Sequence, residues 1–212
     1  MYKVLMEKIP EKELSIEILN ARYNLAPFDS GSAELNDFLK NDALKEQQEL
    51  LSKTHLCFYK DRVACFITLT ADSVQVRLPP KKDGKRELNL DESQLIDDCN
   101  YPAYPCILIA RLATDKKLQE SGIGSHLLSL AIGFALDGPL GCRYLSVDPK
   151  DESEESKKRP EDYYKKFGFN YWTKSKRRMY LNMRGVAQQL QSNDSLDRWG
   201  ESEERAEDSK VK

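Results

Sequence analysis

The stretch Gln-Glu-Ser-Gly-Ile-Gly, residues 119–124, lies between two apolar segments. The run before it, CILIARLAT at 106–114, has the length and composition of a buried strand. The segment that begins at Ile123 repeats apolar residues at helical spacing until Gly138-Pro139, which predicts a helix. Residues without a Cβ let backbone N–H groups approach an anion closely, and a helix N-terminus adds its positive dipole end. This order of elements therefore fits a loop that holds a phosphate.

Two glycines one residue apart are equally typical of a plain structural turn, and the pair alone does not separate the two interpretations. Two common nucleotide-binding motifs are excluded by spacing. A P-loop requires Gly-Lys-Ser/Thr, whereas Gly124 is followed by Ser125-His126. A dinucleotide fingerprint requires a third glycine at the position of Leu127.

The segments around the loop alternate between strand-like and helix-like patterns. Upstream, 27–51 predicts an amphipathic helix with Ser32 as its N-cap, and 54–76 predicts two strands joined by a tight turn at 60–62. A long excursion with four of the nine prolines follows at 79–105. Downstream we expect a strand at 143–147, a highly charged loop at 149–162, a short helix at 161–167 and a last strand at 176–183. The order predicts a mixed α/β sheet.

Length and composition indicate one domain, which we place at 1–190, followed by a charged and disordered tail at 191–212. The 33 Lys and Arg nearly balance the 35 Asp and Glu. The resulting net charge of -2 does not indicate non-specific nucleic-acid binding. Five widely spaced cysteines form no metal-site cluster and indicate reduced thiols. The longest apolar stretch is too short to span a bilayer, so we expect a cytoplasmic protein with no membrane partner.

Two motifs point to a known family. The pattern Gln-x-x-Gly-x-Gly at 119–124 resembles the acyl-CoA pyrophosphate loop of the GNAT N-acetyltransferase superfamily. About forty residues later, YYKKFGF at 163–169 resembles the Tyr-x-x-Phe-Gly-Phe segment that closes the cofactor site in many of these enzymes. FDSG at 28–31 and LNDFL at 35–39 are similar to a subgroup that includes the aminoacyl-tRNA-acetylating toxins of bacterial toxin–antitoxin pairs. The resemblance covers about residues 20–183.

The resemblance implies a single α/β (α+β) domain with a mixed, mostly antiparallel sheet of six to seven strands flanked by helices. It implies acetyl-CoA as cosubstrate, with Leu112, Ala113 and Thr114 pairing with the pantetheine arm. The pyrophosphate would be held through the backbone amides of the loop, that is by Gln119, Glu120, Ser121, Gly122, Ile123, Gly124 and Ser125, with Ser125 adding a hydroxyl. Glu120 and the long charged loop after Asp148 depart from the family's pattern.

The implied reaction is direct attack of a primary amine on the thioester. The register of the second motif selects Tyr164 rather than Tyr163 as general acid, because a phenol of pKa near 10 is protonated at neutral pH. The sequence offers no convincing general base, and His55 and His126 are interpreted as structural. Lys116 and Lys117 are candidates to supplement the loop's hold on the pyrophosphate.

The acceptor and the partners stay open. A small-molecule amine, a protein amine and the α-amino group of an aminoacyl-tRNA are all compatible with the motifs. A further alternative is a CoA-binding interaction module without turnover. A homodimer is expected by analogy with families that the chain resembles.

Overall fold

The computed structural model describes residues 8–75, 103–149, 160–171 and 177–192. Seven strands of this part of the chain form one sheet in the order β1-β2-β3-β4-β5-β7-β6. Neighbouring strands run antiparallel, except that β4 and β5 are parallel. The expected mixed, mostly antiparallel sheet is confirmed. The bounds are β1 (Leu14–Ile18), β2 (Lys53–Tyr59), β3 (Arg62–Gln75), β4 (Ala103–Thr114), β5 (Tyr144–Val147), β6 (Asn170–Tyr171) and β7 (Met179–Asn182).

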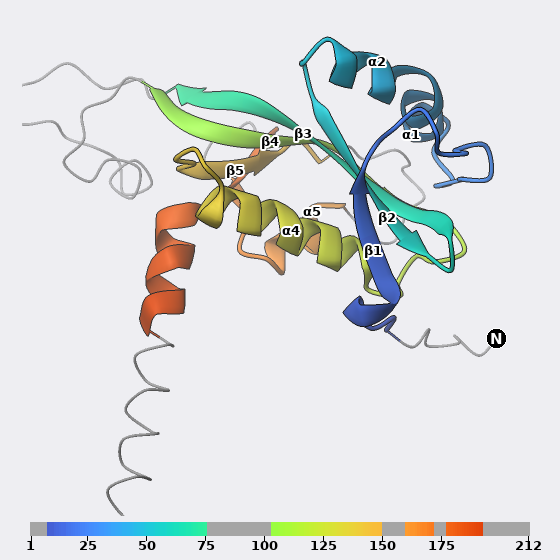
Figure 1. Ribbon diagram of the computed structural model, residues 1–212. Helices are drawn as coiled ribbons and strands as arrows, with labels where there is room; N and C mark the ends of the chain where they lie inside the picture. Colours follow the sequence, from blue (N-terminus) through green and yellow to red (C-terminus); the bar gives the residue numbers. More distant parts are fainter. Residues whose placement is uncertain (1–7, 76–102, 150–159, 172–176, 193–212) are drawn as a thin grey trace, which may run out of the picture.

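Helices flank the sheet on both faces (Figure 1). The longest, α4, links the two parallel strands β4 and β5 and lies along one face. The helices near the N-terminus lie over the opposite face, at the end of the sheet near β2. The bounds are η1 (Glu11–Glu13), α1 (Ala33–Asp37), the π-helical turn η2 (Phe38–Asp42), α2 (Ala43–Gln48), α4 (Ile123–Asp137), α5 (Pro160–Lys165) and a C-terminal helix at 183–192.

Alternating side chains of the central strands build two apolar cores. Successive residues of a strand point to opposite faces, so Cys65 packs beneath α4 while Phe66 packs beneath α1 and α2. In the second core the ring of Phe66 lies 5.6 Å from that of Phe28 and 6.3 Å from that of Phe38. These contacts dock the N-terminal helices on the sheet, and with them the segment at 28–31.

The predicted helix within 27–51 is confirmed, with one irregularity. Ser32 is its N-cap and accepts a hydrogen bond from the N–H of Leu35 at 3.3 Å. The π turn η2 interrupts the α-helical pairing at Phe38–Asp42 and buries Phe38 and Leu39 against the sheet. Helical spacing predicted the helix, but it did not predict this extra residue in the turn.

Several boundaries differ from the sequence prediction. The excursion predicted for 79–105 was wrong at its end, because 103–105 extends β4 and pairs with β3, while the part before residue 103 lies outside the described residues. The edge strand β1 and the helix at 183–192 were missed, although Leu14, Ile16 and Ile18 alternate with polar residues as a strand requires. The tail beyond residue 192 lies outside the described residues.

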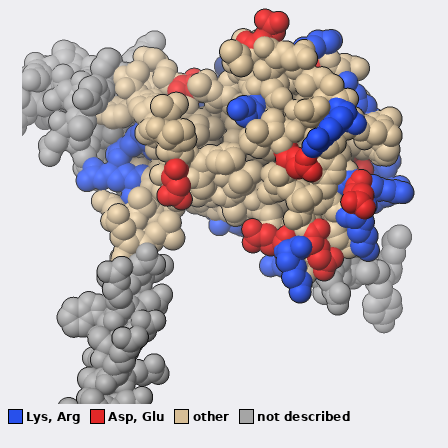
Figure 2. Space-filling model, in the orientation of Figure 1, with Lys and Arg blue, Asp and Glu red and all other residues tan. Residues whose placement is uncertain are grey.

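Charged side chains are spread over the surface without a patch of one sign on the face in Figure 2. Several form short-range pairs on helices, such as Lys165 with Glu161 at 3.2 Å and Lys45 with Asp42 at 3.4 Å. Such exposed pairs contribute little to stability. This face agrees with the near-zero net charge of the chain.

A polar network joins the segment 28–31 to the end of β4. Asp29 accepts a hydrogen bond from the Lys116 ammonium at 2.6 Å and others from Gly31 N–H and the Asn36 amide, both at 2.9 Å. In return the Asp29 N–H donates to Asp115 at 3.1 Å. Lys116 and the donors from Gly31 and Asn36 lower the pKa of Asp29 well below its usual range. Two segments 86 residues apart are thereby held together.

We predict that Asp29→Asn lowers the melting temperature at pH 7. A carboxyl whose pKa is lower in the folded than in the unfolded chain stabilises the fold above its unfolded pKa of about 3.9. That stabilisation is lost as the pH falls toward the folded pKa, so the difference between wild type and variant shrinks below about pH 4. Asp42→Asn removes an exposed pair and is the matched control. Melting curves that show the same Asp29→Asn difference at pH 7 and pH 3 would contradict this assignment.

Candidate active site

The sheet opens beside β4. This strand pairs with β3 along its whole length, from Ala103 to Thr114, but it pairs with β5 only from Cys106 to Ile109. The register with β3 also shifts so that Ala110 is left as a bulge. Beyond Ile109 the described residues supply no strand on the β5 side. Alternate backbone N–H and C=O groups of Arg111–Thr114 are therefore open to an extended ligand.

The glycine loop follows this open edge and ends at the start of α4. Gly122 is the N-cap, with a left-handed φ of +89° that favours glycine, and it provides no side-chain cap. Ser125 and His126 donate their N–H groups to the Gly122 carbonyl at 2.9 and 3.4 Å. In contrast, the N–H groups of Gly122, Ile123 and Gly124 donate to no described residue.

The N-terminal end of α4 carries a partial positive charge that no acidic residue of its first turn offsets. The first turn of α4 contains no acidic residue, and three consecutive N–H groups lack a partner within the described chain. Aligned peptide dipoles place a partial positive charge at such an end, and successive free amides form an anion-binding concavity. The loop therefore has the chemistry to hold a pyrophosphate, which favours the cradle over the plain turn.

The side chains of the loop have different roles from its backbone. The Gln119 amide donates to the Ser30 carbonyl at 3.0 Å and to the Thr114 carbonyl at 3.4 Å, so it ties the loop to 28–31 and to β4. Lys116, a candidate to supplement the loop, is paired with Asp29. Glu120 has a φ of +69° and is exposed. The side chain of Gln119 is thus turned to structural partners, which the local sequence pattern does not predict.

Tyr163 lies directly beneath the loop. A Cβ added to Gly124 would stand 3.3 Å from the Tyr163 hydroxyl and 3.3 Å from Thr114 Oγ1, so only a very small residue fits there. The Tyr163 hydroxyl is buried and has no hydrogen-bond partner of acceptable geometry, although Ser125 is close enough to influence it. Burial raises the pKa of Tyr163 to about 12, and the nearby Ser125 hydroxyl opposes this rise.

Tyr164 lies beside Tyr163 and packs on Phe169. The ring centroids are 5.2 Å apart for the two tyrosines and 5.7 Å apart for Tyr164 and Phe169. Tyr164 is 8% exposed, and its hydroxyl donates to no described residue. Burial above all, with smaller contributions from Tyr163 and Cys65, raises the pKa of Tyr164. The phenol therefore stays protonated through neutral pH, as a proton donor must.

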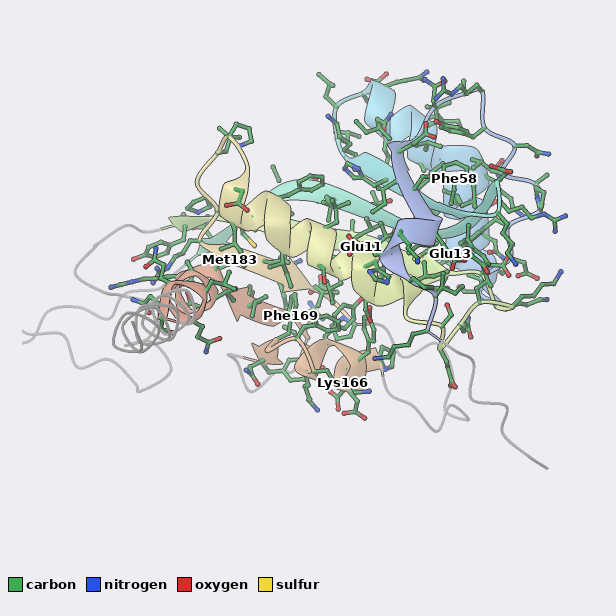
Figure 3. All side chains as sticks on the ribbon, turned by 60° about the horizontal axis from the view of Figure 1, so that its bottom comes forward. Glu11, Glu13, Phe58, Lys166, Phe169 and Met183 are labelled. Carbon is green, nitrogen blue, oxygen red and sulfur yellow. The ribbon has the colours of Figure 1, made fainter. Side chains whose placement is uncertain are left out.

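The rest of YYKKFGF fixes these tyrosines. Phe169 is fully buried, and in Figure 3 it points into the core beneath α4, whereas Lys166 points outward. Gly168 adopts a φ of +86° and turns the chain toward β6. The prediction that the phenylalanines serve packing is confirmed for Phe169, and Phe167 is partly buried against the same core.

Neither histidine of the chain is placed as a base. His126 Nε2 lies 3.4 Å from the Ile9 carbonyl, and His55 is buried against Phe134, with burial lowering its pKa. Asp148 directly follows β5 near the open edge, but both of its oxygens accept from Arg178 at 2.7 Å. In the described part of the chain, no cluster of three or more His, Cys, Asp or Glu side chains forms a metal site.

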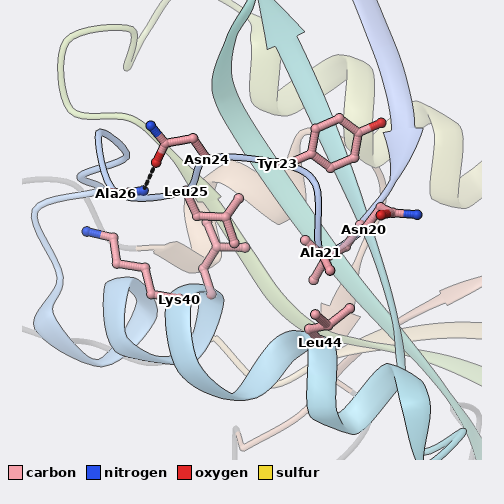
Figure 4. A pocket seen from close by; sticks show the side chains of 10 residues that line it. Asn20, Ala21, Tyr23, Asn24, Leu25, Ala26, Lys40 and Leu44 are labelled. Atoms are coloured by element: carbon pink, nitrogen blue, oxygen red, sulfur yellow. Dashed lines mark hydrogen bonds between the residues drawn. The ribbon is translucent and has the colours of Figure 1, made fainter.

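A cavity of about 380 Å³ lies between the 19–26 segment and the helix at 33–48 (Figure 4). Leucines line its base, and Asn20, Tyr23, Asn24 and Lys40 supply polar groups. None of the predicted cofactor-binding residues lines it. This hollow therefore belongs to the N-terminal helices, and the strand edge and glycine loop form a separate feature. No helix in the described ranges has the length and apolar character needed to cross a bilayer.

The comparisons with known proteins decide the family. A tRNA-acetylating toxin of Mycobacterium tuberculosis (strain ATCC 25618 / H37Rv) is 33% identical over 126 residues, which are 58% of this chain and 68% of the toxin. The chain belongs to the GNAT N-acetyltransferases, in a subgroup that resembles the aminoacyl-tRNA-acetylating toxins. It is thus an acyltransferase, as its two motifs predicted. No protein-family model matches the chain.

Solved structures of GNAT toxins share the fold. AtaT complexed with acetyl-methionyl-tRNAfMet superposes with a TM-score of 0.65 at 22% identity, over 84% of this chain and 99% of AtaT. AtaTR bound with AcCoA gives a TM-score of 0.66 at 22% identity and the same coverage. A mutant of KacT gives 0.65 at 20% identity, over 83% of this chain and 98% of KacT. At these identities the likeness establishes the fold alone.

Proposed function

We propose that this GNAT protein transfers an acetyl group from acetyl-CoA to the α-amino group of an aminoacyl-tRNA. The observation that carries the proposal is the 33% identity to a tRNA-acetylating toxin across 68% of that toxin. The open edge of β4, the uncapped start of α4 and the protonated Tyr164 supply the parts that such a transfer needs.

The residues present fit the cofactor. The free N–H groups of Gly122, Ile123 and Gly124 suit the pyrophosphate, and the lack of a Cβ at Gly124 keeps the space above Tyr163 and Thr114 open. Leu112, Ala113 and Thr114 belong to the unpaired edge on which an extended pantetheine arm would lie. Bound acetyl-CoA supplies the thioester as the activated acetyl group. The Ser121 hydroxyl donates to the Leu118 carbonyl at 2.5 Å, so this residue would help to hold the loop in shape.

Tyr164 would donate a proton to the departing thiolate. Its raised pKa means that the hydroxyl holds its proton in the resting enzyme and stabilises negative charge on sulfur by donating a hydrogen bond. The absence of a suitably placed histidine base fits an acceptor that is itself neutral. An α-amino group has a pKa near 7.7–8.0, so a large fraction is unprotonated at physiological pH.

A primary amine of another kind, such as a polyamine or a lysine side chain, is the second candidate acceptor. A lysine amine has a pKa of about 10.4 and would need a base to lose its proton. Neither His55 nor His126 is placed to act as one, which favours the α-amino acceptor.

The acceptor is tested by incubating the purified protein with radiolabelled acetyl-CoA and three separate acceptors: total aminoacylated tRNA, deacylated tRNA, and a panel of polyamines and lysine peptides. We expect label only in aminoacylated tRNA, and mild alkaline hydrolysis should release it as N-acetyl-amino acid. Label in the amine panel and not in RNA would overturn the tRNA acceptor. Acetyl-CoA binding without transfer to any acceptor would instead support a non-catalytic CoA-binding module.

The two adjacent tyrosines provide a matched pair of variants. We expect Tyr164→Phe to lower kcat by about 10²–10⁴-fold with little change in acetyl-CoA affinity, because a general acid contributes in that range. Tyr163→Phe removes a buried hydroxyl that has no partner, so it should leave kcat within a few-fold of wild type. It should also keep or raise the melting temperature, since an unsatisfied buried group costs about 1–3 kcal/mol. A larger loss of kcat in Tyr163→Phe than in Tyr164→Phe would reverse the assignment.

A further inference from the structure

No cationic side chain lies within the glycine loop at 119–124, and the exposed Lys117 precedes the loop by two residues. Gln119 is neutral and bonded to Ser30, Glu120 is acidic, and Lys116 is engaged by Asp29. A pyrophosphate bound there would meet backbone dipoles with an acidic side chain close by in the sequence. Phosphate sites usually add a lysine or arginine to such dipoles.

The N-terminal segment crosses the loop at this point. The Ile9 N–H donates to the Ser121 carbonyl at 3.0 Å, and the Ile9 carbonyl lies 3.4 Å from His126 Nε2 on the first turn of α4. Residues 8–10 are thus fastened to both the loop and the helix. Figure 1 shows η1, which follows directly, beside the N-terminal end of α4.

Lys8 lies against the loop's first glycine. Its Cγ and Cβ are 3.8 and 4.0 Å from the point where a Cβ of Gly122 would stand. The Lys8 side chain is exposed, and no carboxylate among the described residues pairs with it. Beyond Cγ the chain carries two more methylenes and the ammonium, which is sufficient reach to the neighbouring free N–H groups of Ile123 and Gly124.

We propose that Lys8 supplies the cationic side chain for the pyrophosphate of the bound acyl-CoA, in place of a basic residue within the loop. The inference rests on the proposed function and adds a residue outside both family motifs. The left-handed φ of Gly122 shapes the loop, and the Lys8 stem packs at van der Waals distance from this glycine. Tethering of Ile9 to Ser121 and His126 restricts the backbone of Lys8 and so lowers the entropy lost when its ammonium meets the phosphates.

The charged residues of η1 allow a direct contact of Lys8 to be distinguished from a general effect of nearby charge. Glu11 and Glu13 carry negative charge in η1, as Figure 3 shows near the start of α4, and Lys12 lies between them. If this segment acted on the ligand only through its general charge, removing the charge of Lys12 would weaken binding as much as removing that of Lys8. If a direct contact is made, only Lys8 matters, because only its stem is held against Gly122.

Calorimetric titration of the full chain with acetyl-CoA and with its 3′-dephospho analogue tests the proposal. We expect Lys8→Gln to weaken both ligands by the same factor, about tenfold (about 1.4 kcal/mol) at low salt, because the pyrophosphate is common to both. The factor should shrink at high salt. Lys8→Arg should retain most of the affinity, and the matched control Lys12→Gln should bind as wild type.

Each alternative outcome is distinct. Loss of affinity for acetyl-CoA alone would place the Lys8 ammonium at the 3′-phosphate and overturn the proposal. Equal losses in Lys8→Gln and Lys12→Gln, or no loss in either, would overturn it too. Loss in Lys8→Arg as large as in Lys8→Gln, with a lowered melting temperature, would assign Lys8 a packing role. Wild-type protein that binds neither ligand would reject the proposed function itself, whereas wild-type binding with unchanged Lys8→Gln rejects only this inference.

Discussion

The architecture of the site depends on one constraint: β4 keeps both neighbours only as far as Ile109. Beyond this point β3 continues beside it, the bulge at Ala110 alters its course, and β5 no longer pairs with it. A strand edge inside a sheet is costly unless something pairs with it, because its N–H and C=O groups lose their partners. Here the open edge belongs to the strand that leads into the glycine loop, so a single ligand could pair with the strand and reach the start of α4.

Contacts between distant segments hold this end of the sheet in place. Asp29 engages Lys116 and Asp115, Gln119 reaches the Ser30 carbonyl, and Ile9 binds Ser121. The Gln119 side chain therefore holds the loop in position, while the N–H groups of Gly122, Ile123 and Gly124 have no partner among the described residues. This division explains how a loop with a neutral and an acidic residue, Gln119 and Glu120, is suited to an anion. It also explains why the FDSG segment accompanies the glycine loop: both are parts of one hydrogen-bonded unit.

Local patterns in the sequence predicted the elements that carry the site. These signals are short-range: the apolar run at 106–114, the glycines at 122 and 124, and the periodic segment after them. They correspond, in that order, to β4, the loop and α4. The bulge at Ala110, the partner of Gln119 and the place of Lys8 were not predictable, because each depends on a residue far away in the chain. Gln119 and Ser30, for example, are 89 positions apart. The edge strand β1 was missed because Ile16 and Ile18 are exposed and its pattern is only five residues long.

Amide hydrogen exchange with and without acetyl-CoA tests the central claim most directly, since it reports on the backbone groups that the ligand is expected to bind. Slower exchange should appear at Gly122, Ile123 and Gly124 and at alternate residues of Arg111–Thr114, because free N–H groups would acquire acceptors. Unchanged exchange at these positions in the presence of saturating acetyl-CoA, or slower exchange confined to the cavity beside 19–26, would contradict the assignment of this edge and loop as the cofactor site.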